Sequence, residues 1–376
     1  MDKPIRVLHV LQRMEAAGVQ TLLMSIYRNI DRSKVQFDFL VHYKEEQFFD
    51  KEIEAMGGRV YKLSVREDHN MIKYFKDLNK FFSEHNEYKI VHGHMPVLGV
   101  FYLHAAYKAK VPVRIAHAHT DQHYNNFKGY IARLMKRVYP IFANYYFACS
   151  DSAGKYIFGK RKYTVIRNAI ATECFAYQED IRDRVRKELG LENKFVIGHV
   201  GRFAEHKNHS FLIDVFAEIV KIHPKSELLL VGDGELRDRI VQKVYNLGLD
   251  DKVRFLGVRE DVNELYQAMD AFVFPSIFEG LGIVNIEAQA SGVLTFCSDA
   301  VPKEANISPV FTSIPLTSSA TKWAQIIVAK CYSRKPREDM SGYVKKAEYD
   351  AKDLKNKIQY FYLDKYCERL RDNDRN

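Results

Sequence analysis

The sequence predicts an α/β protein with two doubly wound domains of parallel strands. Short apolar runs alternate along the chain with longer stretches compatible with helices, which is the pattern of repeated β-α units. Most runs are apolar throughout rather than at every second position, as expected for parallel strands that helices cover on both faces. With 376 residues, 47% of them hydrophobic, the chain is too long for one ordinary core and fits two domains.

The apolar runs mark the predicted strands in order. Those of the first half are Ile5–Leu11, Phe37–Val41, Ile90–His94, Val113–His117, Tyr145–Ser150 and Thr164–Ile166, and those of the second half are Phe195–Val200, Glu227–Val231, Val253–Leu256, Ala271–Phe274 and Val293–Cys297. A charged helix pattern over Asp180–Gly190 separates the groups, so the seam falls between Asn168 and Leu191, and Asp350–Leu370 is predicted to be a last helix. Open parallel sheets bind ligands at the carboxyl ends of their strands, so the loops after these runs are where we expect a site.

Composition argues against several classes of protein. The five cysteines are scattered, odd in number and without metal-ligand spacing, which indicates reduced thiols in a cytosolic protein. The sequence has no apolar run of about 18 residues or more, so we expect no transmembrane helix. The charged N-terminus runs directly into a predicted strand and lacks the layout of a secretory signal.

The net charge of +9 is concentrated in the first half of the chain. Residues 1–180 carry 27 Lys and Arg against 19 Asp and Glu, whereas the remainder carries 30 against 29. A basic half beside a neutral half suggests an anionic partner for the first. Because we find no zinc finger and no RNP-type aromatic motif, we expect an anionic membrane surface or a lipid-linked phosphate on it, and no nucleic acid.

The most informative segment is the turn and helix after the predicted strand that ends at Phe274. The strand stops at Pro275, a glycine-flanked turn follows, and a helix is predicted with Glu279 just before it and Glu287 inside it. The free N–H groups at such a helix start, Gly280–Ile283, favour a phosphate. The two carboxylates can accept hydrogen bonds from sugar hydroxyls. A site for both a diphosphate and sugar rings indicates a nucleotide-sugar.

Two cations follow the predicted strand that ends at Val200. Gly201 opens a loop in which Arg202 and Lys207 precede a helix that starts near Asn208–Ser210. They can hold a diphosphate from two sides, because the arginine guanidinium offers forked N–H donors and the lysine ammonium a point charge. If the diphosphate is a leaving group, they also stabilise the negative charge that develops on it. Two solvated loop cations are the alternative. The second phosphate site in the sequence favours the diphosphate.

Two further loops follow strands predicted at the same sheet edge. Gly232 and Gly234 form a G-x-G turn between a strand and a helix, but the third glycine of a dinucleotide fingerprint is absent. A tight β-to-α turn explains the pair equally well. Backbone groups near Val258 and Arg259 could pair with a nucleobase, with the guanidinium against its face. The alternative is a loop arginine paired with one of the two acidic residues that follow it.

The first half offers weaker signals. His117 and His119 lie on the same side of an extended chain where a strand gives way to a loop. Either side chain can hydrogen-bond a sugar hydroxyl, and we favour His119. A metal site is the alternative, but we find no third and fourth ligand at the sequence spacing typical of metal sites. Gly18 would let the backbone approach a ligand at a helix start. The apolar stripe over Lys128–Phe147, with basic residues around it, suits a membrane interface or an ordinary helix packed on its sheet.

Together these residues resemble the GT-B glycosyltransferases, specifically the retaining group known as glycosyltransferase family 4. The family's E-x7-E motif, G-R-x4-K loop and G-D-G-x-L turn are matched by Glu279 and Glu287, by Gly201, Arg202 and Lys207, and by Gly232–Leu236. The resemblance covers nearly the whole chain and is most specific in the second half. It is strongest to enzymes that build bacterial capsular or exopolysaccharides.

The resemblance implies two Rossmann-like domains that face a cleft. Residues 1–172 would bind the acceptor, residues 173–345 the nucleotide-sugar, and residues 346–376 would form a helix that crosses back to the first domain. It implies transfer of a hexose or N-acetylhexosamine from a UDP-sugar to a lipid-linked saccharide with retention of configuration. It further implies no cofactor and no divalent metal. From the cysteines and the basic first half, we expect a cytoplasmic enzyme that contacts the inner face of the cell membrane.

The resemblance also implies a role for each site residue. The catalytic residues would be Glu279 at the donor sugar, His119 at the sugar's far side, and Arg202 and Lys207 at the diphosphate. Glu287 would bind the ribose hydroxyls. The other donor-binding positions would be Gly18, Gly201, Gly232, Gly234, Val258, Arg259, Gly280, Leu281, Gly282 and Ile283.

The chain departs from the family's motifs at a few positions, among them Gly282, where the family often has proline, and two alternative functions accompany the resemblance. The family's G-G-x-E/Q loop reads Ala17-Gly18-Val19-Gln20 here, and its N-G after the linker reads Asn168-Ala169. A sugar-nucleotide epimerase of the same fold would need an acid and a base but no acceptor, and the glutamate spacing favours a transferase. A catalytically inactive glycosyltransferase-like subunit is supported by Ala17, while the retained cations and glutamates count against it.

Overall fold

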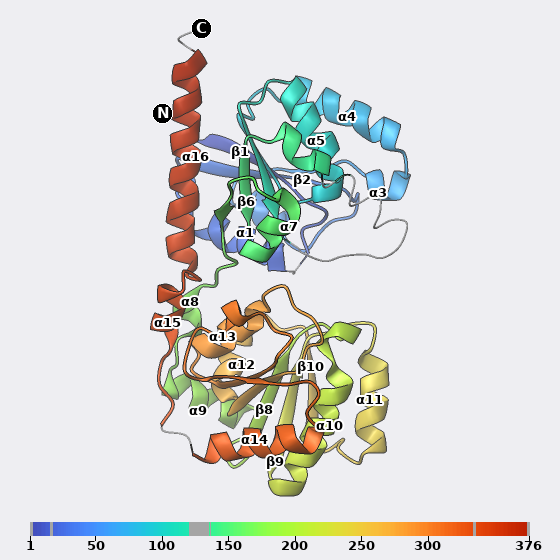
Figure 1. Ribbon diagram of the computed structural model, residues 1–376, viewed down its shortest axis with the longest axis vertical. Helices are drawn as coiled ribbons and strands as arrows, with labels where there is room; N and C mark the ends of the chain where they lie inside the picture. The colour runs from blue at the N-terminus through green and yellow to red at the C-terminus, as the bar shows by residue number, and fades with distance from the viewer. Residues whose placement is uncertain (1–2, 16–17, 120–134, 136, 334–335, 374–376) are drawn as a thin grey trace. The chain divides into compact units, whose positions relative to one another are not determined.

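The computed structural model describes residues 3–15, 18–119, 135, 137–333 and 336–373. The chain divides into two compact units, shown in Figure 1. The first unit comprises Met1–Ala169 and Ala351–Asn376, and the second unit comprises Ile170–Asp350. Each unit is built around one parallel sheet, so the predicted α/β fold class is confirmed.

The sheet of the first unit has seven strands in the order β3-β2-β1-β4-β5-β6-β7. They are β1 (Ile5–Val10), β2 (Val35–Val41), β3 (Val60–Lys62), β4 (Ile90–Gly93), β5 (Val113–Ala118), β6 (Tyr145–Ala148) and β7 (Thr164–Val165). Its helices are α1 (Gly18–Asn29), α2 (Asp50–Ala55), α3 (Val65–Asp68), α4 (Met71–Glu84), α5 (Pro96–Lys108), η1 (Tyr139–Phe142), α7 (Asp151–Phe158) and α16 (Ala351–Asn373). Residues 128–134 and 136 of the Lys128–Phe147 stripe lie outside the described residues.

Helices bury both faces of this sheet because successive strand residues point to opposite sides. Val7 and Phe37 lie in one buried cluster, and Leu8 lies in another on the opposite face. The last helix, α16, packs on α1, β2 and β5 and adds Ile358 and Tyr362 to the first cluster (Figure 1). No helix among the described residues has the length and apolar character needed to cross a membrane.

The sheet of the second unit has six strands in the order β10-β9-β8-β11-β12-β13. They are β8 (Phe195–Val200), β9 (Ser226–Val231), β10 (Val253–Gly257), β11 (Ala271–Phe274), β12 (Leu294–Ser298) and β13 (Phe311–Ile314). Its helices are α8 (Thr172–Phe175), α9 (Glu179–Glu188), η2 (Glu205–Lys207), α10 (His209–Ile222), α11 (Arg237–Asn246), α12 (Val262–Ala268), α13 (Ile283–Ala290), η3 (Lys303–Ala305), α14 (Ala320–Tyr332) and α15 (Ser341–Lys346).

All the predicted strands are present, with ends that differ by a few residues. The sequence missed β3 and β13, which both lie at the edge of a sheet. Their side chains are mostly half-buried or exposed. An edge strand packs against fewer neighbours, so its residues carry a weaker apolar signal.

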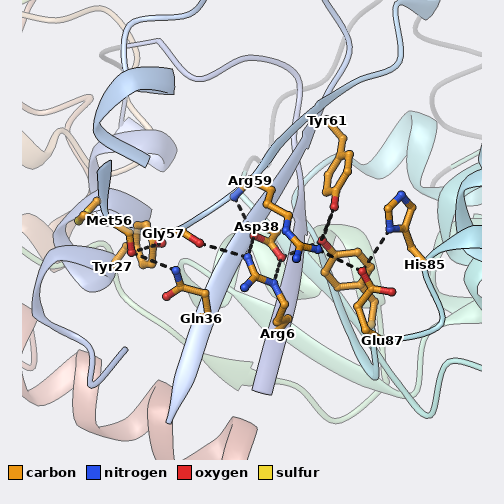
Figure 2. A network of polar contacts seen from close by, with 11 residues as sticks. Arg6, Tyr27, Gln36, Asp38, Met56, Gly57, Arg59, Tyr61, His85 and Glu87 are labelled. Atoms are coloured by element: carbon orange, nitrogen blue, oxygen red, sulfur yellow. Dashed lines mark hydrogen bonds and ion pairs between the residues drawn. The ribbon is translucent and has the colours of Figure 1, made fainter. Parts of the chain in front are cut away.

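A buried carboxylate joins β1 to β2 (Figure 2). Asp38 is fully buried and accepts hydrogen bonds from Arg6 Nε at 2.6 Å, from the Arg59 backbone N–H at 2.8 Å and from the Tyr88 hydroxyl at 2.7 Å. A buried charge is tolerated when it is paired and hydrogen-bonded in this way. Because Arg6 lies near the amino end of β1, away from the edge where ligands bind, we assign this network to the fold.

Candidate functional site

The residues predicted from the second half meet at the carboxyl edge of the second unit's sheet. There β8 pairs with β11, and the order of the strands reverses between them. This reversal is the switch point at which open parallel sheets bind ligands. Arg202 and Lys207 follow β8, and Glu279 follows β11, so both predicted motifs lie at that point.

Lys207 and Glu279 form an ion pair that joins the two motifs. Lys207 Nζ lies 2.6 Å from Glu279 Oε1, and the two side chains are only 15% and 9% exposed. The same carboxylate oxygen accepts a hydrogen bond from Ser276 Oγ at 2.8 Å. The ammonium also lies 4.8 Å from the centre of the Phe274 ring. An incoming anion would therefore compete with Glu279 for this cation.

One backbone hydrogen bond and one side-chain hydrogen bond hold the two loops together beside this pair. The N–H of Ile277 donates to the carbonyl of His206 at 2.8 Å, and Asn208 Nδ2 donates to the carbonyl of Pro275 at 3.1 Å. The loop after β8 and the loop after β11 are thus fixed to one another on both sides of the ion pair. The arrangement is preformed and does not depend on the long lysine side chain alone.

Arg202 is exposed and pairs with a residue outside this cluster. Its side chain is 72% exposed, and its Nε lies 3.1 Å from Glu235 Oε2. An exposed pair of this kind is weak, because both ions remain hydrated and screened. The guanidinium can leave Glu235 for a phosphate at little cost.

The two glycines of the G-x-G turn allow a close approach of two loops. Gly232 has a φ of +126°, and a Cβ there would lie 2.3 Å from the carbonyl oxygen of Gly201. A Cβ on Gly234 would lie 2.7 Å from the backbone N of Phe203. Phe203 N–H in turn donates to the carbonyl of Asp233 at 3.0 Å. Packing on the loop after β8 is therefore sufficient reason for glycine at both positions.

Glu287 lies in α13, about one helical turn after the loop formed by Gly280, Leu281 and Gly282. Gly282 precedes the helix with a left-handed φ of +71°. Tyr266 Oη donates to Glu287 Oε2 at 3.1 Å. Burial raises the pKa of the Glu287 carboxyl to about 7, and the hydrogen bond from Tyr266 opposes part of that rise.

The loop after β10 carries the two residues predicted to contact a nucleobase, of which Val258 is exposed and Arg259 is paired. Val258 is 71% exposed. Arg259 makes two hydrogen bonds to Asp261, at 2.7 and 2.6 Å, which is the pairing that the sequence offered as the alternative. The guanidinium would have to leave Asp261 before it could lie against a base.

The first unit holds the remaining predicted residues, Gly18 and His119. Gly18 begins α1, and a Cβ there would meet no heavy atom within 4 Å; its neighbour Ala17 lies outside the described residues. His119 directly follows β5, and its Nε2 lies 2.9 Å from His94 Nδ1. His94 Nε2 lies 3.1 Å from His9 Nδ1.

His117 belongs to a second chain of hydrogen bonds beside the first. Its Nδ1 lies 3.1 Å from His92 Nε2, and His92 Nδ1 lies 2.6 Å from the Tyr362 hydroxyl. Burial lowers the pKa of both His9 and His119 to about 3, so these rings are neutral at physiological pH. The sequence pattern indicated two of these five histidines, and the tertiary structure adds the other three.

Several of these contacts could not be found from single motifs. Ser276 and Tyr266 hold the two glutamates but belong to no recognised pattern. His92 and His94 repeat the H-x-H spacing of His117 and His119 at the end of another strand. This repeated spacing could have been recognised in the sequence.

Comparison with known proteins gives the family. Residues 181–307 match the model for glycosyl transferases group 1, and residues 16–173 match the model for glycosyltransferase family 4. The chain is 32% identical over 357 residues to a putative glycosyltransferase EpsF of Bacillus subtilis (strain 168), covering 92% of this chain and 93% of the relative. It is 27% identical over 304 residues to a UDP-Gal:alpha-D-GlcNAc-diphosphoundecaprenol alpha-1,3-galactosyltransferase of Escherichia coli, covering 77% and 78%.

Solved structures share the architecture. HepE of Anabaena, crystallised with UDP and glucose, superposes with a TM-score of 0.78 over 95% of this chain and 99% of that chain, at 21% sequence identity. The likeness at this identity shows the fold, which is GT-B. The chain therefore belongs to the GT-B glycosyltransferases that combine a family 4 domain with a group 1 domain.

Proposed function

We propose that this protein transfers a hexose or an N-acetylhexosamine from a UDP-sugar to a lipid-linked saccharide in the synthesis of a capsular or exopolysaccharide. The observation that carries the proposal is the Lys207–Glu279 pair at the switch point, because it unites a cation, a carboxylate and a helix start. The names of two similar proteins support the donor and acceptor classes: the Escherichia coli relative is named for UDP-Gal and a diphosphoundecaprenol acceptor, and HepE was crystallised with UDP.

The diphosphate would be bound by cations and backbone amides. Arg202, Lys207 and the free N–H groups of Gly280–Ile283 would surround it and stabilise the charge that develops on UDP as it leaves. These groups supply the positive charge without a divalent metal. By taking the ammonium of Lys207, the diphosphate would free the Glu279 carboxylate for the donor sugar.

The other groups would position the nucleoside and the sugar. Glu287 would accept hydrogen bonds from the ribose hydroxyls, and Val258 and Arg259 would contact the base. His119 of the first unit would touch the far side of the donor sugar. The acceptor would attack on the face that the diphosphate leaves, which retains the anomeric configuration.

The basic charge of the first half favours contact with an anionic membrane, where a lipid-linked acceptor would lie. Residues 1–180 carry 27 Lys and Arg against 19 Asp and Glu. Such an excess attracts anionic lipids and lipid-linked phosphates. We therefore propose a cytoplasmic enzyme that contacts the inner face of the cell membrane without crossing it.

Calorimetric titration with UDP, GDP, ADP and NAD tests the donor site, with Glu287→Gln as the matched variant. UDP should bind, and Glu287→Gln should weaken it. Preference for another nucleotide would contradict the UDP donor, and failure to bind any of them would favour an inactive subunit. A screen of UDP-sugars with lipid-linked acceptors then tests transfer. Glu279→Gln should slow transfer while UDP still binds, and NMR of the product should show the donor's anomeric configuration.

A further inference from the structure

Two polar groups near the Lys207–Glu279 pair are buried and have no hydrogen-bond partner among the described residues. One is Nε2 of His199, which belongs to β8, and the other is Nδ2 of Asn285, which belongs to α13. Both side chains are fully buried. A buried polar group without a partner costs free energy, so each of these two calls for an explanation.

His199 can only accept a hydrogen bond at Nε2. Its Nδ1 lies 2.9 Å from the carbonyl oxygen of Val273, and because a carbonyl can only accept, Nδ1 carries the N–H. Burial lowers the pKa of His199 well below its ordinary value, so the ring is neutral and Nε2 holds a lone pair. The ring of His209, whose centre lies 4.6 Å away, makes no hydrogen bond to it.

This lone pair lies beside the side chain of Lys207. A Cβ on Gly201 would lie 3.2 Å from His199 Nε2, and 3.6 and 3.7 Å from Cδ and Cε of Lys207. Because Gly201 has no side chain, nothing from this residue separates the imidazole from the lysine. Both groups also contact Phe274: the imidazole stacks on its ring with the centres 5.4 Å apart, and the ammonium lies 4.8 Å from the ring centre.

Asn285 offers a donor on the glutamate side of the pair. The Cys297 thiol donates to Asn285 Oδ1 at 3.1 Å, and burial raises the pKa of this thiol, which keeps it protonated. The amide is thereby oriented with its Nδ2 donor unpaired. A Cβ on Gly282 would lie 2.6 Å from Asn285 Nδ2 and 3.6 Å from Glu279 Cγ, so the unpaired donor lies near the base of the glutamate side chain.

The ion pair therefore has an unpaired acceptor near its cation and an unpaired donor near its anion. We propose that His199 and Asn285 are positioning residues that receive Lys207 and Glu279 when a diphosphate separates the pair. The imidazole would accept one N–H of the ammonium while the phosphate takes another. The amide would donate to the carboxylate and hold it as the donor sugar arrives. This inference rests on the proposed function, because it requires a diphosphate that competes for Lys207.

The burial of the pair is the reason that such partners are needed. The side chains of Lys207 and Glu279 are only 15% and 9% exposed, so water can replace a lost partner only in part. Breaking a buried pair is costly when it leaves a charge without a partner. The two unpaired groups would lower the cost of opening the pair, since each has the polarity that the charge next to it requires.

The wild-type protein itself tests the proposal by NMR. UDP is titrated into the full-length protein labelled with 15N at histidine, and the His199 signals are those missing from His199→Asn. UDP should shift the Nε2 signal as a new hydrogen bond does and leave the Nδ1 signal nearly unchanged. The shift should be absent in Lys207→Met saturated with UDP. Binding of UDP without a change at Nε2 would overturn this proposal and leave the proposed function intact, whereas no binding of UDP would overturn both.

A double-mutant cycle tests the lysine side. His199→Asn keeps a donor for the Val273 carbonyl but loses the acceptor at Nε2. It should weaken UDP binding about 10-fold in the wild type and have no effect in Lys207→Met, where the partner of the acceptor is gone. His69→Asn should bind as the wild type does, because His69 is exposed and has a left-handed φ that Asn tolerates. An equal loss in both backgrounds, or no loss in the wild type, would refute the role of His199.

The same design tests the glutamate side. Asn285→Leu removes the donor with little change in side-chain volume, and the thiol that it leaves without an acceptor is only a weak donor. It should weaken UDP binding about 10-fold in the wild type and have almost no effect in Glu279→Gln, where no ion pair has to open. Asn246→Leu, at an exposed position of α11, should bind as the wild type does. Additive losses would show a structural role only and refute the role of Asn285.

Discussion

Single residues at the switch point differ in how firmly the structure holds them. Lys207 is partly buried and paired with Glu279, whereas Arg202 is exposed and has only a surface partner. Both cations come from the same loop, so the sequence motif alone ranks them equally. In the proposed complex, the buried Lys207 would define the position of the diphosphate, and the exposed Arg202 would be free to move onto it.

We expect Lys207→Ala to weaken the binding of a UDP-sugar about 10- to 150-fold. The change removes one charge-assisted phosphate contact, which contributes about 1.5–3 kcal/mol. It also leaves the Glu279 carboxylate without its cation, close to the incoming anion. Titration calorimetry measures the affinity, and Lys187→Ala, an exposed lysine of α9, is the control. Equal affinity in the wild type and Lys207→Ala would remove this residue from the site.

The affinity for UDP should rise as the pH increases through about 7. Burial raises the pKa of the Glu287 carboxyl to about 7, so below that pH it is protonated and offers fewer acceptor positions to the ribose. Tyr266→Phe removes a hydrogen bond that lowers this pKa, so it should move the rise to higher pH. Calorimetry across neutral pH measures both effects. A pH profile that persists in Glu287→Gln would show that another group is responsible.

At the scale of elements, the turn after β9 and the loop after β8 depend on each other. Gly232 allows the backbone of the turn to meet Gly201, and this contact positions the loop that carries Arg202 and Lys207. The glycines are therefore coupled to the site through packing, whatever ligand contact they make. A change in the turn should act on stability as well as on binding.

Gly232→Ala should destabilise the second unit. The new Cβ would lie 2.3 Å from the Gly201 carbonyl oxygen, and the φ of +126° is unfavourable for alanine. Such backbone strain alone costs about 1–3 kcal/mol. Urea unfolding measures the change in stability. Gly342→Ala is the control, because a Cβ there meets no heavy atom within 4 Å, and it should leave the stability equal or higher. Equal stability of Gly232→Ala and wild type would show that the loops can separate freely.

At the scale of the whole molecule, the two ends of the chain belong to one unit. Residues Ala351–Asn376 fold with Met1–Ala169, and Ile358 of α16 is buried with the core of the first sheet. The second unit is a single continuous segment, Ile170–Asp350, that holds the whole predicted diphosphate site. Damage to α16 should therefore affect one unit more than the other.

Ile358→Ala should destabilise the first unit by about 2–5 kcal/mol, the usual cost of a large-to-small change in a core. UDP binding by the folded protein should stay as in the wild type, because the proposed diphosphate site lies in the second unit. Calorimetric unfolding and UDP titration measure the two effects. Tyr360→Ala is the control, since Tyr360 lies on the same helix and is 72% exposed. A loss of UDP affinity in folded Ile358→Ala would contradict this separation.

Binding to anionic vesicles should fall as the salt concentration rises. The basic excess of the first half acts through exposed charges, and salt screens these beyond about 10 Å at 0.1 M. Co-sedimentation with anionic vesicles measures binding, and neutral vesicles are the control. Binding that ignores salt, or none at all, would contradict peripheral membrane contact.

The sequence by itself determined the α/β class, the central strands and the segments that carry the site. These features are local: apolar runs mark buried strands, and a loop after a strand can be read from a few adjacent residues. The short edge strands β3 and β13 lack that signal because they pack against fewer neighbours. Only the tertiary structure decided that Lys207 meets Glu279, that Tyr266 meets Glu287 and that five histidines from three strands share one face. Such contacts join residues far apart in the chain, and the order of strands in the sheet, which no local pattern encodes, brings them together.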